Sequence, residues 1–107
     1  MNSGPRVHMP KQAQKGDVVR IRTKVLHPME TGWRKDHHGH EVPRNRIHTF
    51  VCTFEGQEVF SADLHSGVAK DPYLSFFFKA ETSGTLNFVW KADNEVELTK
   101  QARIEVV

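Results

Sequence analysis

The stretch VRIRTKV, residues 19–25, decides the fold class of this chain. Every second residue in it is apolar or β-branched, and the residues between are basic. The first set is Val19, Ile21, Thr23 and Val25, and the second is Arg20, Arg22 and Lys24. Because successive side chains of a β-strand point to opposite faces, a period of two predicts a strand with one buried face and one face in water.

The same alternation continues along the rest of the sequence. Apolar residues share one face in four further runs: Phe50, Cys52 and Phe54; Leu74, Phe76 and Phe78; Leu86, Phe88 and Trp90; Val96, Leu98, Ala102, Ile104 and Val106. Two weaker strands are predicted over residues 6–9 and 57–64, and the second follows a Glu55-Gly56 turn as the arm of a hairpin. No window shows the 3.6-residue period of a helix.

About seven strands in about 100 residues predict an all-β chain with an immunoglobulin-like β-sandwich of antiparallel strands. A chain of 107 residues has room for one core, so residues 1–107 are expected to form a single domain. Seven Phe and two Trp supply large core side chains. We therefore expect folding without a cofactor.

Overall charge and hydropathy exclude several classes of partner. Fifteen Lys and Arg stand against 13 Asp and Glu, and the formal charge of +2 is too even to indicate a nucleic-acid partner. No segment approaches the roughly 18 apolar residues of a membrane span. Residues 1–6 also lack the apolar run of a secretory signal, so composition alone points to the cytoplasm.

The single cysteine, Cys52, cannot form an internal disulfide. It is expected on the core face of its strand, between Phe50 and Phe54, where a thiolate is disfavoured. His48 lies four residues earlier on the same strand, about 13 Å away along an extended chain, and is too far to act as its base. Catalysis by Cys52 is the weaker interpretation, and a buried structural thiol is the stronger one.

The one long connection, residues 27–46, holds the remaining candidates for function. Three histidines lie within four residues, at His37, His38 and His40. Together with Met29 they are candidate ligands for copper or zinc. The cluster has no neighbouring thiol or carboxylate in a metal-site spacing, so a solvated His-rich loop is the better interpretation and no metal site is predicted.

Apolar residues on the outward phase of strands predict a binding surface. Ile47, Val51 and Val89 are expected to form an apolar patch on the outer face of one sheet, and Tyr73 and Phe77 also point outward. Two covers are possible for the patch, a partner protein or the 27–46 loop itself. In that loop Trp33 either folds over the core or anchors an interface with Met29 and Arg34.

Several longer motifs resemble the SoxZ family. They are FVCTFEGQEVFSADLH at residues 50–65, HPMETG at 27–32, RKD at 34–36 and DPY at 71–73. KGDV at 15–18 and SGT at 83–85 extend the similarity over nearly the whole chain in the expected order. The residues around His37–His40 are not characteristic of the family.

The resemblance implies an accessory, non-enzymatic subunit of the SoxYZ complex of thiosulfate oxidation. Its partner SoxY carries sulfur on a cysteine in a C-terminal Gly-Gly-Cys-Gly-Gly arm, whereas this sequence ends in the strand-like RIEVV, residues 103–107. The family is periplasmic and is taken to be exported with its signal-bearing partner, which replaces the cytoplasmic expectation. Transient contacts with other sulfur-oxidation enzymes are also implied.

Three functions therefore compete at this point. The leading hypothesis is a binding subunit that stabilises a SoxY-like carrier and presents it to enzymes. The second is a periplasmic copper or zinc module built on His37, His38 and His40. The third is an enzyme that acts through Cys52, which an accessible thiol of low pKa would support.

Overall fold

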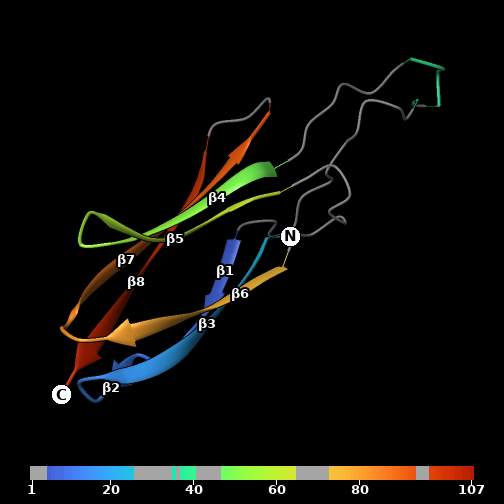
Figure 1. Ribbon diagram of the computed structural model, residues 1–107. Helices are drawn as coiled ribbons and strands as arrows, with labels where there is room; N and C mark the ends of the chain where they lie inside the picture. The colour runs from blue at the N-terminus through green and yellow to red at the C-terminus, as the bar shows by residue number, and fades with distance from the viewer. Residues whose placement is uncertain (1–4, 26–34, 36, 41–46, 65–72, 94–96) are drawn as a thin grey trace.

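The computed structural model describes residues 5–25, 35, 37–40, 47–64, 73–93 and 97–107. These residues form eight β-strands and no helix (Figure 1). The strands are β1 (Pro5–His8), β2 (Gln12–Ala13), β3 (Asp17–Val25), β4 (Ile47–Phe54), β5 (Gln57–Asp63), β6 (Tyr73–Ala80), β7 (Gly84–Ala92) and β8 (Leu98–Val106). The described part of the chain thus contains no helix capable of spanning a membrane.

The strands are arranged in two sheets that pack face to face (Figure 1). One sheet has three strands in the order β1-β3-β6, and the other has five in the order β2-β8-β7-β4-β5. Hairpin neighbours β4–β5 and β7–β8 pair within the larger sheet, while β3 and β6 pair across a long stretch of sequence. This arrangement confirms the predicted all-β, immunoglobulin-like sandwich.

All seven predicted strands are present, and β2 is an addition to them. Gln12 and Ala13 pair with Glu105 and Val106 of β8 in parallel orientation, whereas the seven predicted strands all pair antiparallel with one another. Backbone bonds from Glu105 N to Lys11 O and from Val107 N to Ala13 O, both 2.9 Å, hold it in place. Two residues are too few to show alternation in the sequence, which is why the strand was not predicted.

The core between the sheets is largely aromatic. Phe50, Phe88 and Trp90 are fully buried and Phe76 is 6% exposed, which confirms the predicted core. The ring centroids of Phe50 and Trp90 are 5.1 Å apart within the larger sheet, and those of Phe50 and Phe76 are 6.1 Å apart between the sheets. Tilted contacts at these distances are favourable for aromatic pairs, so these rings hold the two layers together.

The β4–β5 hairpin has the two-residue turn expected from Glu55-Gly56. Phe54 pairs with Gln57, and the two residues between them have positive φ values, 48° at Glu55 and 87° at Gly56. Two consecutive positive φ values are typical of a type I′ turn, whose twist matches that of the flanking strands. The Glu55 carboxylate also accepts a 2.7 Å hydrogen bond from Thr85 N, which ties the turn to β7.

Candidate binding surface

The outer face of the five-stranded sheet has an uncharged centre. The strand registers place Thr53, Asn87 and Gln101 side by side in one row, and Val51, Val89 and Thr99 in the next. Within the first row Gln101 Nε2 donates a 2.7 Å hydrogen bond to Asn87 Oδ1. We call the surface formed by these two rows of uncharged side chains the neutral face.

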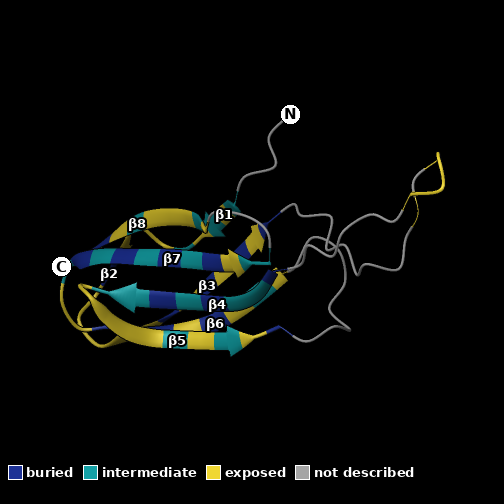
Figure 2. Ribbon diagram, turned by 90° about the horizontal axis from the view of Figure 1, so that it is seen from above, coloured by how far each residue is buried: buried dark blue, intermediate teal, exposed yellow. Residues whose placement is uncertain are grey.

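Val51 and Val89 lie near the middle of the neutral face. They are direct cross-strand partners between β4 and β7, and each is half-buried. Figure 2 shows buried and intermediate residues alternating along β7. The sequence prediction that these two valines share one outward patch is therefore confirmed in its geometry. Their role in binding a partner remains a prediction.

Ile47 does not belong to this patch. It is fully buried, and its predicted outward position was wrong. The β4–β7 register passes from Ile47↔Ala92 directly to Thr49↔Lys91, so His48 is an extra residue in β4. A bulge of this kind reverses the side-chain phase, which turns Ile47 inward although it stands at an odd number like Val51.

Charged side chains are found at the ends of the neutral face. Lys91 Nζ lies 3.9 Å from Glu97 Oε2 at one end, and Arg103 binds Glu105 at the other. At the β5 edge the exposed Glu58 is the cross-strand partner of Thr53. A centre depleted of charge with a charged rim is the composition of many protein–protein interfaces. The geometry thus resembles a docking surface more than a catalytic site.

The structure describes only some of the candidate binding and metal-ligand residues in the 27–46 connection. Met29, Trp33 and Arg34 lie outside the described residues. His37, His38 and His40 are described and exposed, with ring centroids 4.0 Å apart for His37 and His38 and 6.3 Å apart for His38 and His40. Within the described residues, no three His, Cys, Asp or Glu side chains form a group that could hold a metal ion.

Cys52 lies in the core, as predicted from its phase on β4. It is fully buried and pairs with Phe60 on one side and Phe88 on the other. Burial raises the pKa of its thiol to about 12. The thiolate needed by a nucleophile or a sulfur carrier is therefore disfavoured at neutral pH. His48, considered above as a base for Cys52, has its Nδ1 atom 2.8 Å from Thr49 Oγ1.

Comparison with protein-family models gives a match over residues 7–103 to SoxZ, described as sulphur oxidation protein SoxZ. The match covers both sheets and nearly the whole chain. The chain belongs to the SoxZ family. This finding confirms the resemblance drawn from the motifs, and it places this SoxZ-family chain in sulfur oxidation.

Solved structures with the same fold include proteins of different function. A putative superoxide reductase from Thermotoga maritima aligns with a TM-score of 0.76 at 17% identity, over 99% of this chain and 88% of that one. Superoxide reductase (neelaredoxin) from Ignicoccus hospitalis gives 0.74 at 17% identity, over 97% and 80%. At these identities the likeness shows the fold alone.

The sulfur carrier protein SoxY from Chlorobium limicola f. thiosulfatophilum also shares the fold. Its TM-score is 0.69 at 14% identity, and the alignment covers 99% of this SoxZ-family chain and 81% of that SoxY chain. A comparison with curated protein sequences finds no match. The family match therefore carries the assignment, and the structural neighbours support the sandwich architecture.

Proposed function

We propose that this chain is the non-carrier subunit of a sulfur carrier complex, in which it binds and stabilises a SoxY-like protein. The observation that carries this proposal is the position of Cys52. A carrier thiol has to be exposed on a flexible segment so that it can enter several active sites. The only cysteine of this chain is fully buried within β4. Sulfur must then be attached to the partner.

The neutral face supports a role in binding. Val51 and Val89 form its apolar centre, and the hydrogen-bonded Asn87 and Gln101 already satisfy part of their polar groups within the sheet. The two central rows lose little hydration free energy when they are covered, because they contain no charged side chain. We assign the SoxY-like partner to this face, together with the loop that carries Met29, Trp33 and Arg34.

The shared fold supports pairing between like sandwiches. A SoxY chain from Chlorobium limicola f. thiosulfatophilum has the same two-sheet architecture. Two sandwiches of similar twist can stack sheet against sheet, since aligned sheets pack closely when their strand directions agree within about 30°. In the proposed complex the chain supplies no active site, and we place the complex in the periplasm, exported together with its partner.

Intact-mass spectrometry tests the carrier assignment directly. The purified complex with a SoxY-like subunit is incubated with thiosulfate and the oxidising enzymes, and both subunits are weighed. We expect sulfur or sulfonate adducts on the partner and an unchanged mass for this chain. An adduct on Cys52 would overturn the proposal and restore the interpretation of this chain as an enzyme or carrier.

A further inference from the structure

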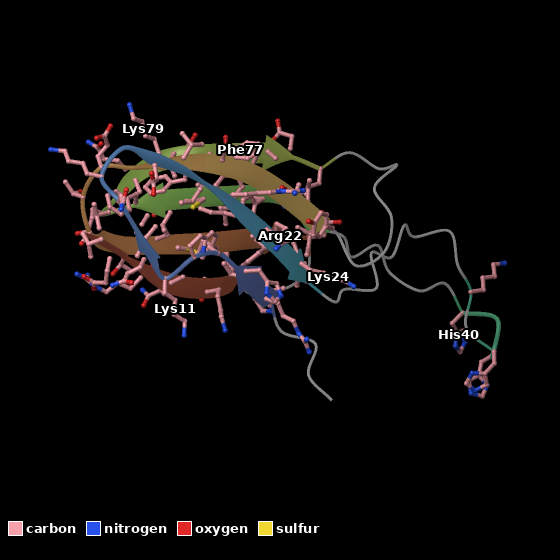
Figure 3. All side chains as sticks on the ribbon, turned by 90° about the horizontal axis from the view of Figure 1, so that it is seen from below. Lys11, Arg22, Lys24, His40, Phe77 and Lys79 are labelled. Carbon is pink, nitrogen blue, oxygen red and sulfur yellow. The ribbon has the colours of Figure 1, made fainter. Side chains whose placement is uncertain are left out.

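The outer face of the three-stranded sheet is strongly basic although the whole chain is nearly neutral. Four exposed cations from two adjacent strands gather there, and with the exposed aromatic residues of β6 they form what we call the cationic face. The cations are Arg6 on β1 and Arg20, Arg22 and Lys24 on β3. Figure 3 views this face and labels Arg22, Lys24 and Phe77 on it.

Carboxylates do not neutralise these cations within the described part of the chain. The residues that point outward from β1, β3 and β6 include no Asp or Glu. Two described acids at one end of these strands have other partners: Glu81 lies 3.3 Å from Lys79, and Asp17 accepts a hydrogen bond from Gln14 N. The outward residues of these strands therefore leave a positive electrostatic potential over this face, which can attract an anionic group from outside the three strands.

The strand register makes this arrangement unfavourable for the isolated chain. Arg6 is the direct cross-strand partner of Lys24, and His8 is the partner of Arg22. Arg6 and Lys24 carry like charges directly opposite each other, which is destabilising in a sheet, and stability alone would favour an acidic residue at one of these two positions. An anionic ligand over the face would relieve this repulsion.

Exposed aromatic residues lie beside the cations. Phe77 is 69% exposed and is the cross-strand partner of Arg20, while Tyr73 is 54% exposed and is the partner of Lys24. Arg20 Nε donates a 2.9 Å hydrogen bond to Ser75 Oγ, which holds the guanidinium between the two strands. Arg and aromatic side chains are the residues enriched at hot spots of protein interfaces.

A shallow hollow crosses the β1 side of this face. Its volume is about 520 Å³, and it is lined by His8, Met9, Pro10, Arg20 and Arg22. Two guanidinium groups in one hollow can bind carboxylates in bidentate geometry. The hollow therefore gives acidic side chains a defined place to bind.

From these observations we propose that the cationic face is a second docking surface, which binds an acidic surface of another protein. This surface lies on the opposite side of the sandwich from the neutral face, so a protein bound here can be held at the same time as the SoxY-like partner (Figures 1 and 3). The nearly even net charge of the whole chain, +2, favours an acidic protein surface over a polyanionic nucleic acid as the ligand of this face.

The test uses two fluorescent peptides of equal length and charge on the full-length chain. One repeats Asp-Glu-Leu and the other repeats Asp-Glu-Ser. We expect both to bind with an affinity that falls as salt is raised, because exposed charges are screened beyond roughly 8 Å at physiological ionic strength. The Leu peptide should bind more tightly, and Phe77→Ser should remove that advantage.

A matched pair of variants locates the site. Arg20→Glu/Arg22→Glu and Lys91→Glu/Arg103→Glu both change the net charge from +2 to −2, since each reversal subtracts two. The first should weaken peptide binding by about tenfold or more, and the second, on the other sheet, should weaken it much less. Circular dichroism confirms that each variant is folded.

Three results would overturn the proposal. Equal losses in the two double variants would mean that only net charge matters. Tighter binding of a single-stranded DNA of equal charge would indicate a nucleic-acid surface instead. If Arg20→Glu/Arg22→Glu no longer binds the SoxY-like partner, that partner occupies this face and the second docking surface does not exist. If the variant keeps the complex but loses peptide binding, the second surface is supported independently of the proposed function.

Discussion

At the scale of single residues, position along a strand decides the environment of chemically identical side chains. Phe88 on β7 is fully buried, whereas Phe77 on β6 is 69% exposed. Phe76 and Phe78, the chain neighbours of Phe77, point inward and are nearly buried. The two faces of one strand thus separate core residues from residues that can meet a partner.

Replacing Phe88 with alanine should destabilise the fold by about 3 to 5 kcal/mol, as truncation of buried Phe residues does. The loss combines the hydrophobic transfer energy of the ring with the cavity left against Phe50 and Trp90. Urea unfolding followed by circular dichroism measures it. Phe77→Ala is the control and should change stability by no more than about 0.5 kcal/mol; similar effects of the two substitutions would contradict the assigned core.

Cys52 should resist alkylation in the folded chain. Its pKa is raised by burial to about 12, so the folded state keeps the proton at a pH where an ordinary exposed thiol is already thiolate. Because the unfolded chain loses that proton at lower pH, the contribution of this group to stability declines as pH rises from about 9 toward about 12.

Iodoacetamide labelling from pH 7 to pH 9 measures this reactivity. We expect slow labelling in buffer and fast labelling in denaturant, with Cys52→Ala as the blank. Rapid labelling of the native chain at pH 7 would show an accessible thiol of low pKa, and the structural role assigned to Cys52 would have to be abandoned.

At the scale of elements, β4 determines how the larger sheet presents its residues. Its pairing with β7 contains the bulge at His48, and its pairing with β5 shifts between Cys52 and Thr53. Each shift places one extra residue in a strand and increases the local twist. The first buries Ile47, and the second precedes the tight turn at Glu55 and Gly56.

Substituting Gly56 with alanine should destabilise the β4–β5 hairpin by about 1 to 2 kcal/mol, the cost of a left-handed conformation for a residue with a Cβ. A Cβ at this position meets no atom within 4 Å, so the effect comes from backbone conformation and not from a clash. Gly56→Asn is the matched control, since Asn tolerates this conformation better. Thermal unfolding should rank the chains as wild type, then Asn, then Ala; an Ala variant as stable as wild type would contradict the type I′ turn.

At the scale of the whole molecule, the two outer faces of the sandwich differ in chemistry. The larger sheet presents neutral Thr, Val, Asn and Gln side chains at the centre of its outer face, and the smaller one presents Arg and Lys beside exposed aromatic rings. A formal charge of +2 hides this asymmetry because the acids are placed elsewhere on the chain. Two faces of different chemistry allow one small subunit to contact two different proteins.

Introducing a carboxylate at the centre of the neutral face should prevent formation of the complex with a SoxY-like partner. In Val51→Asp or Val89→Asp the isolated chain should keep its circular dichroism spectrum, because both positions reach solvent from the outer face. Burying the new charge against a partner would cost several kcal/mol. Co-purification measures the outcome, and Val107→Asp, at an exposed residue beyond β8, should leave the complex intact. A complex that survives both central substitutions would move the interface to another surface.

The sequence by itself determined the fold class, the seven longer strands and the core rings Phe50, Phe76, Phe88 and Trp90. These depend on side-chain alternation within one strand, which is a local property and can be read directly from the residues. The inward position of Cys52 and the outward phase of Val51 and Val89 follow from the same alternation, whereas placing both valines on one sheet depended on the immunoglobulin-like strand order. The family assignment was also accessible, because its motifs extend along nearly the whole chain.

Only the tertiary structure decided the features that depend on how strands meet. The bulge that buries Ile47 arises from the register between β4 and β7, and the parallel pairing of β2 arises from where the chain passes β8. The cationic face likewise requires that β1 lie beside β3 with Arg6 opposite Lys24, which alternation within either strand cannot reveal. Strand register and sheet order result from contacts between residues distant in sequence, and a local pattern carries no information about them.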